Sequence, residues 1–594
     1  MNWFKTAVPA LFAIAISVAA SESVTDDWNQ FRFRGAGVAE MEVVKTSGQS
    51  FPSAAKIAVK AARPLTYDVQ LAAPCALPLE LDGEVVEVIF HARCLSPLPG
   101  KNYAQVQALV EVAGPPWSKF VFTPVQITGN TWKRYHAFGR SRPAKKDAKR
   151  DFGPGETQVG FNLAYGPQTL ELAGVEVVKH KGVTATEGLP ISPFYYPGRE
   201  ANAAWRAEAE KRIETIRKGD FTLKLEDAAG NPLAGVPVRV EMVRHRFPFG
   251  SCINRWMAVD DDNDNQQRYL DEFAKWFNQA VFESSMKWHN GFAVDDEVRS
   301  VMKFLKENRI SLRGHCTLWP SWQMTPPWLR LLEKRPDAIR EVVRDHIFYQ
   351  IGTLKDDVVE MDLVNEPYTH NDLIKLLGGE KVIGDWFRTA RQAAPDLPLY
   401  INDFGILVSA DKPEDEHRKH YHEVISRLLQ EKAPLGGIGM QSHFTDPQTP
   451  ENMLKILDEY GKYGLPIKLT EYDFNTFDEA LAGDYMRDIL YVAFSHPAVE
   501  GFLMWGFWDG QHWLGNAPIF RADWSLKPSG KVFDELVHHR WSTRLEGKSD
   551  ATGIYAGRGF YGDYRVSVTT GDGKTVEVPF TLEPGITNYT VKVK

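Results

Sequence analysis

Apolar and polar residues alternate in short runs between residues 24 and 180. Examples are AKIAVKA, VVEVIFHARC, AQVQALVEV and TLELAGVEVV, and Gly, Pro and Asn separate the runs. Alternation with a period of two is typical of strands that bury one face, and those three residues mark the turns. Many short strands in succession predict a β-sandwich, most simply a jelly roll, over residues 24–180.

The pattern changes at residues 181–219. A Pro-rich joint (188–200) precedes NAAWRAEAEKRIETIRKG, whose Ala, Glu, Arg and Lys favour a helix that Gly219 should end. Alternating runs return at 220–245 and again at 545–594. We predict that these two pieces pair as one small transthyretin-like or Ig-like sandwich with a domain inserted between them. Two independent β pieces are the alternative.

Residues 246–540 follow a third pattern, in which apolar runs of four to seven residues alternate with helical stretches. Eight such runs occur: FPFGSCI, QAVFESSMKW, SLRGHCTLW, VVEMDLVNE, PLYINDF, GIGMQSHF, PIKLTEYDF and GFLMWGFWD. Intervening helical patterns include EVRSVMKFLKENRI and ENMLKILDEYGKYG. Eight β–α repeats predict a (β/α)₈ TIM barrel, so that the whole chain is a multidomain protein.

Composition narrows the classes of function. A chain of 594 residues with 25% charged and 43% apolar residues is globular and should form two to four domains. The formal charge of −8 is small for this size and argues against nucleic acid as a partner. Seventeen Trp suit either core packing or contact with sugar rings.

The N-terminus resembles a secretory signal. Lys5 supplies the positive charge and residues 7–20 are apolar and end in small residues, so residues 1–20 are predicted to be a signal peptide. The run is short for a transmembrane helix, and no other apolar stretch reaches that length. We therefore expect a secreted or periplasmic protein without a membrane partner.

Four cysteines are too few for a disulfide scaffold, although Cys75 and Cys94 flank neighbouring strand-like runs where they can pair or stay free. Their spacing matches no metal site, so we expect neither a metal nor another cofactor. The sequence is silent on structural calcium, which jelly rolls of this kind often hold.

Polar or aromatic residues end every barrel run at the side where active sites of (β/α)₈ barrels lie. Each alone has a simple structural explanation, such as a solvated carboxylate or a core Trp, but their joint placement indicates a lined pocket. Glu366 and Glu471 end the fourth and seventh runs, on opposite sides of the barrel mouth. Glycoside hydrolysis needs such a pair, one carboxyl group protonated and the other ionised. His443 is placed to orient the ionised group, and Asn365 to donate to a sugar hydroxyl.

The motifs ESSMKW, RGHCTLW, DLVNEP, INDF, GIGMQSHF, LTEYDF and WGFWDGQHW occur in the order found in glycoside hydrolase family 10, the endo-β-1,4-xylanases. This resemblance covers the barrel, about half of the chain. It implies a retaining enzyme in which Glu366 is the acid/base and Glu471 the nucleophile, with carboxyl groups about 5–5.5 Å apart. It also implies a set of sugar-binding residues, namely Glu283, Lys287, His315, Trp319, Asn365, Gln441, His443, Trp505 and Trp513.

Three positions depart from the family pattern. Ser284 stands where Asn is usual, Pro320 replaces a His, and Trp508 replaces a small residue and is expected to narrow the cleft. The N-terminal sandwich resembles carbohydrate-binding jelly rolls, in which Trp117, Trp132 and Tyr165 would stack on sugar unless they serve the core.

The sequence therefore predicts a secreted retaining endo-1,4-β-xylanase that acts on xylan or xylo-oligosaccharides. A related β-glycanase, an exo-acting xylosidase and a non-hydrolytic carbohydrate-binding protein are the alternatives.

Overall fold

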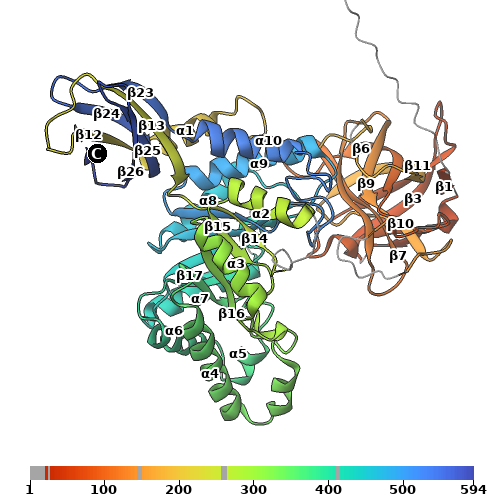
Figure 1. The fold of residues 1–594 in the computed structure, drawn as a ribbon. Coiled ribbons are helices and arrows are strands. Elements are labelled where there is room, and N and C mark those ends of the chain that lie inside the picture. The colour runs from red at the N-terminus through yellow and green to blue at the C-terminus, as the bar shows by residue number, and fades with distance from the viewer. Residues whose placement is uncertain are drawn as a thin grey trace, which may run out of the picture. The chain divides into compact units, whose positions relative to one another are not determined.

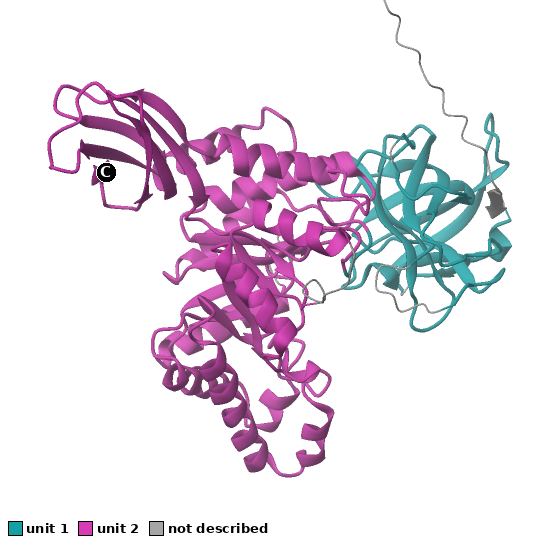
Figure 2. Cartoon of the chain, in the orientation of Figure 1, with its two compact units in different colours: residues 1–195, 513–515 teal, residues 196–512, 516–594 magenta. Residues whose placement is uncertain are grey.

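The computed structural model describes residues 21–24, 27–35, 37–142, 150–186, 188–255, 264–409 and 415–593. The predicted signal peptide, residues 1–20, lies outside these ranges. The chain divides into two compact units, one of residues 1–195 with 513–515 and one of residues 196–512 with 516–594 (Figure 2). Among the helices within the described ranges, none has the length and apolar character needed to cross a membrane.

The first unit is built from antiparallel strands, as the alternating pattern predicts. Its strands are β1 (Ser21–Val24), β2 (Arg32–Arg34), β3 (Ala39–Lys45), β4 (Ser53–Val59), β5 (Gln70–Cys75), β6 (Val85–Ser96), β7 (Tyr103–Val112), β8 (Lys119–Thr128), β9 (Lys133–Arg140), β10 (Thr157–Asn162) and β11 (Gln168–His180). The sheet has two halves, β2-β5-β10-β7-β8 and β9-β6-β11-β4-β3. Among the described residues, the pairing of Val121 with Gly139 joins β8 to β9 and so links them.

The two halves of this sheet share one apolar core. Phe90 on β6 and Phe161 on β10 contact edge to face with ring centroids 4.9 Å apart, and both side chains are fully buried. Aromatic pairs in this geometry add to the free energy gained by burying apolar area. The unit is thus a β-sandwich, while its jelly-roll topology and its binding of carbohydrate stay predictions.

The three aromatic residues predicted to stack on sugar lie in different environments. Trp117 is 45% exposed. Trp132 packs on the core, with its ring centroid 4.8 Å from that of Phe51, so the structural explanation fits it better. Tyr165 is half-buried. Cys75 and Cys94 are buried free thiols, so the pairing considered for them is not formed.

Helix α1 (Ala204–Ile216) opens the second unit, but it does not reach Gly219 as predicted. Arg217 caps the helix, and Gly219 already belongs to β12 (Lys218–Glu226), where it pairs with Gly559 of β24 (Ile554–Phe560). The helix ends earlier than predicted because Lys218 and Gly219 pair, in a strand, with residues more than 300 positions further along the chain.

Strands from both sides of the barrel segment pair with each other in a small sandwich. A three-stranded sheet holds β24, β12 and β27 (Asn588–Lys592), and a four-stranded sheet holds β23 (Arg544–Lys548), β13 (Pro237–His245), β25 (Gly562–Thr569) and β26 (Thr575–Leu582). Their inner faces form a second core that includes Phe221, Val240, Tyr564 and Val566. The barrel is therefore inserted into this small domain (Figure 1).

The predicted barrel is confirmed. Its parallel strands are β14 (Phe249–Ile253), β15 (Gln279–Phe282), β16 (Ser311–Leu318), β17 (Glu360–Asn365), β18 (Leu399–Asp403), β19 (Gly437–Met440), β21 (Ile467–Phe474) and β22 (Val499–Met504). The ring closes because β22 pairs with β14. Each lies within one of the eight apolar runs or begins beside it.

Helices of the second unit surround the barrel strands (Figure 1). They are α2 (Asp264–Trp276), α3 (Asp296–Glu307), α4 (Pro336–Leu354), α5 (Asp372–Leu376), α6 (Lys381–Ala393), α7 (Glu416–Gln430), α8 (Pro450–Gly461), α9 (Glu479–Ser495) and α10 (Pro528–Phe533). The first turns of α3, α7 and α9 are stabilised by Asp295, Asp415 and Asp478, whose carboxylates accept backbone N–H groups three residues on.

A buried cluster of charges occupies the barrel interior near the N-terminal ends of its strands. Arg313 on β16 has no exposed surface and lies between Asp362 and Glu360 of β17, with its Nη1 2.9 Å from Glu360 Oε1. Lys468 on β21 contacts the same Glu360 and donates to Gln279 Oε1 at 3.1 Å. Buried charges are tolerated when they are paired in this way.

Candidate active site

The two predicted catalytic glutamates lie at the mouth of the barrel, on or directly after two strands that are not neighbours. Glu366 directly follows β17, has a φ of 52°, and donates its N–H to the carbonyl of Asn402 at 2.8 Å. Glu471 lies within β21 and donates its N–H to the carbonyl of Gln441 at 2.8 Å. The residues are only 8% and 4% exposed, so both carboxyl groups sit in a largely water-excluded site.

Amide side chains connect the two carboxyl groups. Asn402 Nδ2 donates to Glu471 Oε1 at 2.7 Å and to Asn365 Oδ1 at 2.9 Å. Gln441 Nε2 donates to Glu366 Oε1 at 2.9 Å and lies 3.3 Å from Asn365 Oδ1. The predicted sugar-binding residues Asn365 and Gln441 therefore lie in one network with both glutamates, which fixes the carboxyl groups relative to each other.

Gly439 makes room for the central amide of this network. A Cβ atom at Gly439 would lie 2.3 Å from Asn402 Oδ1, well inside contact distance. The same Oδ1 accepts the hydroxyl of Thr470 at 2.8 Å, which orients the Asn402 side chain so that its amino group faces Glu471. Asn402 belongs to the apolar run PLYINDF, but nothing in the sequence pattern gave it this role.

Histidine and lysine side chains lie near Glu471. Its Oε1 lies 3.9 Å from His315 Nδ1 and its Oε2 lies 3.4 Å from His443 Nε2. Burial alone would raise the pKa of Glu471, but His315, His443 and Lys287 outweigh it and lower the pKa to about 2. The carboxyl group of Glu471 is therefore ionised near neutral pH.

Each of these two histidines also contacts an aspartate through its Nδ1 atom. His315 Nδ1 lies 3.0 Å from Asp362 Oδ2, and His443 Nδ1 lies 2.8 Å from Asp473 Oδ2. Burial would lower the pKa of His443, but Asp473 and Glu471 raise it to about 10. The role predicted for His443, to orient the ionised carboxylate, is compatible with this geometry. Asp362 and Asp473 are supporting residues to which the sequence pattern gave no such role.

The pKa of His443 leads to a prediction on stability. Because the folded pKa lies above the ordinary value, the native protein binds more protons than the unfolded chain between pH 6.5 and about 10. The contribution of His443 to stability is complete below pH 6.5 and should be lost as the pH rises through about 10. We expect the melting temperature of the wild type to fall over this window more steeply than that of Asp473→Asn, whose His443 loses one partner. Equal slopes in calorimetry at pH 6 to 10 would contradict this.

Cationic and aromatic side chains form one wall of the site. The Nζ of Lys287 lies 5.1 Å from the ring centroid of Trp319 and 5.5 Å from that of Trp505. The ring of Trp505 contacts His315 edge to face, with centroids 5.1 Å apart. A flat indole beside fixed hydrogen-bond donors is a surface suited to a sugar ring.

Glu283 follows β15 and accepts a hydrogen bond from Asn254 Nδ2 at 2.6 Å, which holds its carboxylate in place. Trp513 belongs to the short segment that groups with the first unit, so its predicted contact with sugar stays a prediction. The other predicted binding residues all lie on the barrel strands or on the loops that follow them.

The departures from the family pattern have separate structural outcomes. Trp508 is only 7% exposed, and its ring stacks on Trp524 with centroids 4.5 Å apart. The indole is held in this stack, and the expectation that it narrows the cleft stays a prediction. Ser284 is half-buried and its carbonyl accepts Asn290 Nδ2, whereas Pro320 is buried and its carbonyl accepts the N–H of Leu373.

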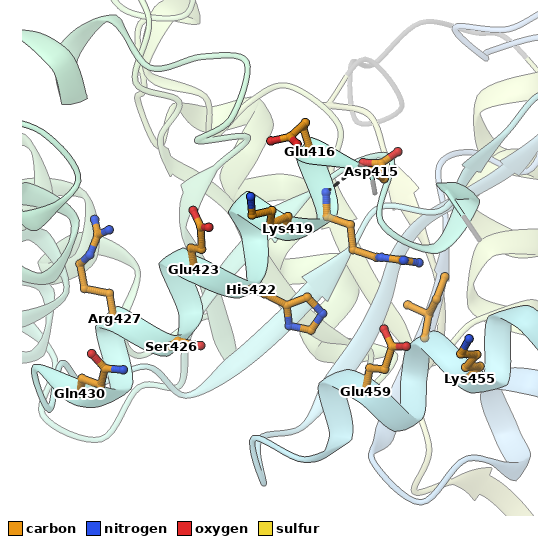
Figure 3. Close-up of a pocket in the computed structure, with 12 residues that line it drawn as sticks. Asp415, Glu416, Lys419, His422, Glu423, Ser426, Arg427, Gln430, Lys455 and Glu459 are labelled. Carbon is orange, nitrogen blue, oxygen red and sulfur yellow. Dashed lines mark hydrogen bonds between the residues drawn. The ribbon is translucent and has the colours of Figure 1, made fainter. Parts of the chain in front are cut away.

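A hollow of about 920 Å³ lies elsewhere, between α7 and α8 (Figure 3). Four acidic and four basic side chains line it, so it offers no excess of either charge: Asp415, Glu416, Glu423, Glu459, Arg418, Lys419, Arg427 and Lys455. None of the predicted site residues lines this hollow. Within the described ranges, no group of three or more His, Cys, Asp or Glu side chains is arranged to hold a metal ion.

Comparison with known proteins gives a consistent result. The model of Glycosyl hydrolase family 10 matches residues 240–536, half of the chain. The chain is 33% identical over 378 residues to anti-sigma-I factor RsgI6 of Acetivibrio thermocellus, covering 62% of this chain and 47% of that protein. It is 30% identical over 380 residues to endo-1,4-beta-xylanase 1 of Arabidopsis thaliana, covering 63% of this chain and 39% of that protein. The chain thus spans less than half the length of these two relatives.

Among solved structures, xylanase 10B from Thermotoga petrophila RKU-1 in complex with xylobiose aligns with 50% of this chain and 95% of its own. The TM-score is 0.45 and the identity 22%.

Proposed function

Because this chain belongs to glycosyl hydrolase family 10, we propose that it hydrolyses the β-1,4-linked backbone of xylan as a retaining endo-xylanase. The observation that supports this most is the pair of buried carboxyl groups, Glu366 and Glu471, linked by Asn402 and Asn365 at the mouth of the barrel. Relatives named as endo-1,4-beta-xylanases support the choice of substrate.

In the first step we assign the attack to Glu471. One of its oxygens bonds to the anomeric carbon while the bond from that carbon to the glycosidic oxygen breaks and its electron pair stays on the oxygen. Glu366 gives its proton to the leaving oxygen. The low pKa of Glu471 keeps the nucleophile ionised, and His443 and His315 stabilise it before the attack.

In the second step a water molecule attacks the same carbon. Glu366, now a carboxylate, takes a proton from the water as the bond to Glu471 breaks, and the sugar leaves with its original configuration. Asn365, beside Glu366, is assigned to the sugar hydroxyl next to the reacting carbon. Lys287, Glu283, Trp319 and Trp505 are assigned to the same sugar-binding surface.

The substrate is tested by the products that the wild-type chain releases. We expect short xylo-oligosaccharides from linear xylan, little product from mixed-linkage glucan, and β-configured products in early NMR spectra. Release of xylose alone would favour the exo-acting alternative, and preference for the glucan would favour a related β-glycanase. No hydrolysis of any of these, together with binding to xylan, would favour the non-hydrolytic alternative.

We also propose export, on the strength of the charged and apolar pattern of residues 1–20. Detection of the wild-type chain outside the cytoplasm, and its retention after deletion of those residues, would test it.

A further inference from the structure

His370, in the loop after β17, contacts the proposed acid/base. Its Nδ1 lies 3.0 Å from Glu366 Oε2, and the His370 side chain is 20% exposed. Nothing in the sequence pattern singled out this residue. His370 contacts Glu366 Oε2, whereas the amide network described above contacts the other oxygen of this carboxyl group, Oε1.

The two oxygens of Glu366 have different neighbours. Oε1 faces the amino groups of Gln441 at 2.9 Å and of Asn365 at 3.4 Å. An oxygen that faces two N–H donors is a poor site for a further proton, because that hydrogen would point at other hydrogens. The transferable proton therefore belongs on Oε2, and the side chain beside Oε2 is His370.

Local backbone geometry holds His370 in this position. Glu366 takes a left-handed φ of 52°, and the N–H of His370 donates to the carbonyl of Glu366 at 3.0 Å, which closes a turn of five residues. The turn runs from Glu366 to His370 and places the imidazole of His370 against the carboxyl group of Glu366. On the other side the ring contacts Trp319 edge to face, with centroids 5.2 Å apart.

The other groups near His370 are few. Thr369 Oγ1 lies 2.9 Å from the same Nδ1, so a hydrogen on this nitrogen is shared between hydroxyl and carboxylate. Across the Trp319 ring lie Lys287, 5.1 Å from the centroid, and the ring of His289, 6.2 Å away. The carboxylate of Asp372 is directed elsewhere, since it accepts the N–H of Trp322.

We propose that His370 is a positioning residue for Glu366, an inference that rests on the proposed function. When Glu366 is protonated, the imidazole carries its hydrogen on Nε2 and Nδ1 accepts the hydrogen bond from Oε2. When Glu366 is a carboxylate, the imidazole carries that hydrogen on Nδ1 instead and donates it to Oε2; exchange with water, which the 20% exposure of the side chain allows, moves the hydrogen from one nitrogen to the other. Oε2 is thereby kept in one place in both protonation states. Proton delivery to the leaving oxygen and proton removal from water then use the same prepositioned atom.

The test compares two variants on two substrates. His370→Phe keeps a ring against Trp319 but removes the nitrogen, and His370→Asn keeps a donor and an acceptor close to the position of Nδ1. On xylotetraose, whose leaving oxygen needs a proton, we expect kcat/KM to fall about 10- to 100-fold in His370→Phe. On dinitrophenyl xylobioside, whose leaving group needs none, we expect a fall of less than about 3-fold. His370→Asn should recover most of the activity on xylotetraose.

A matched control is His289→Phe, which changes a second histidine on the same Trp319 ring without a contact to Glu366. It should leave the ratio of the two kcat/KM values at the wild-type level. Equal losses on both substrates in His370→Phe, or none on either, would overturn the role of His370. Failure of the wild type to hydrolyse dinitrophenyl xylobioside would instead refute the proposed function, so the two failures are distinguishable.

Discussion

Replacing Glu471 by Gln should lower kcat on linear xylan and on aryl xylobiosides by about 10⁴-fold or more, because an amide cannot form the covalent intermediate. The loss should be similar for good and poor leaving groups, since the nucleophile is needed for both. Initial-rate assays at saturating substrate measure this directly. Wild-type and variant proteins that behave alike on an aryl xylobioside would contradict the assignment and favour a non-hydrolytic protein.

Glu283→Gln is the matched control for Glu471→Gln. Glu283 is another carboxylate of the barrel mouth, held by Asn254 at 2.6 Å, and it is assigned to sugar binding. Its replacement should raise KM more than it lowers kcat, because it removes binding that is shared by ground state and transition state. A fall in kcat as large as that in Glu471→Gln would contradict the assignment of Glu283 to sugar binding and of Glu471 alone to the nucleophilic attack.

Replacing Arg313 by Leu should cost about 3–5 kcal/mol of unfolding free energy, because it leaves the carboxylates of Glu360 and Asp362 buried without their shared cation. Burial would raise the pKa of Glu360, but Lys468 and Arg313 hold it at about 2. Without the guanidinium, Glu360 still contacts Lys468 and Asp362 still contacts His315, but the two carboxylates lose the cation that they share. Denaturant unfolding followed by Trp fluorescence gives the loss.

Arg558→Leu provides the comparison at the surface of the same unit. Arg558 Nη1 lies 3.0 Å from Asp220 Oδ1, but the side chains are 42% and 75% exposed. Water screens this pair, so its removal should cost less than about 1 kcal/mol. An equal loss of unfolding free energy in the two variants would contradict the idea that Arg313 stabilises the buried carboxylates of Glu360 and Asp362.

The strand ends of the barrel were predictable because two simple rules coincide. The spacing and length of the apolar runs predict the eight strands. The active sites of (β/α)₈ barrels lie at the C-terminal ends of those strands. Glu366 and Glu471 both follow from these rules. The distance between the carboxyl groups does not, since it depends on how the Asn402 amide bridges two strands.

Other features depend on contacts that no local pattern contains. His370 contacts Glu366 because Glu366 takes a left-handed backbone conformation, which the neighbouring residues in the sequence do not predict. Gly219 was predicted to end a helix, yet the helix ends at Ile216 and Gly219 pairs with Gly559 in a strand. Trp508 stacks on Trp524, a partner that no local pattern assigns to it. Tertiary partners decided each case.

Insertion of the barrel also sets the order in which the second unit can form during synthesis. β13 ends at His245, and its neighbour β23 begins at Arg544, about 300 residues later. At translation rates of about 5–20 residues per second, β12 and β13 wait roughly 15–60 s for the strands that complete their sheets. The whole barrel emerges in that interval. The small sandwich is therefore the last part of this unit to fold. Until then the edges of β12 and β13 have no strand partner, and unpaired edges are the ones most open to pairing with strands of other chains.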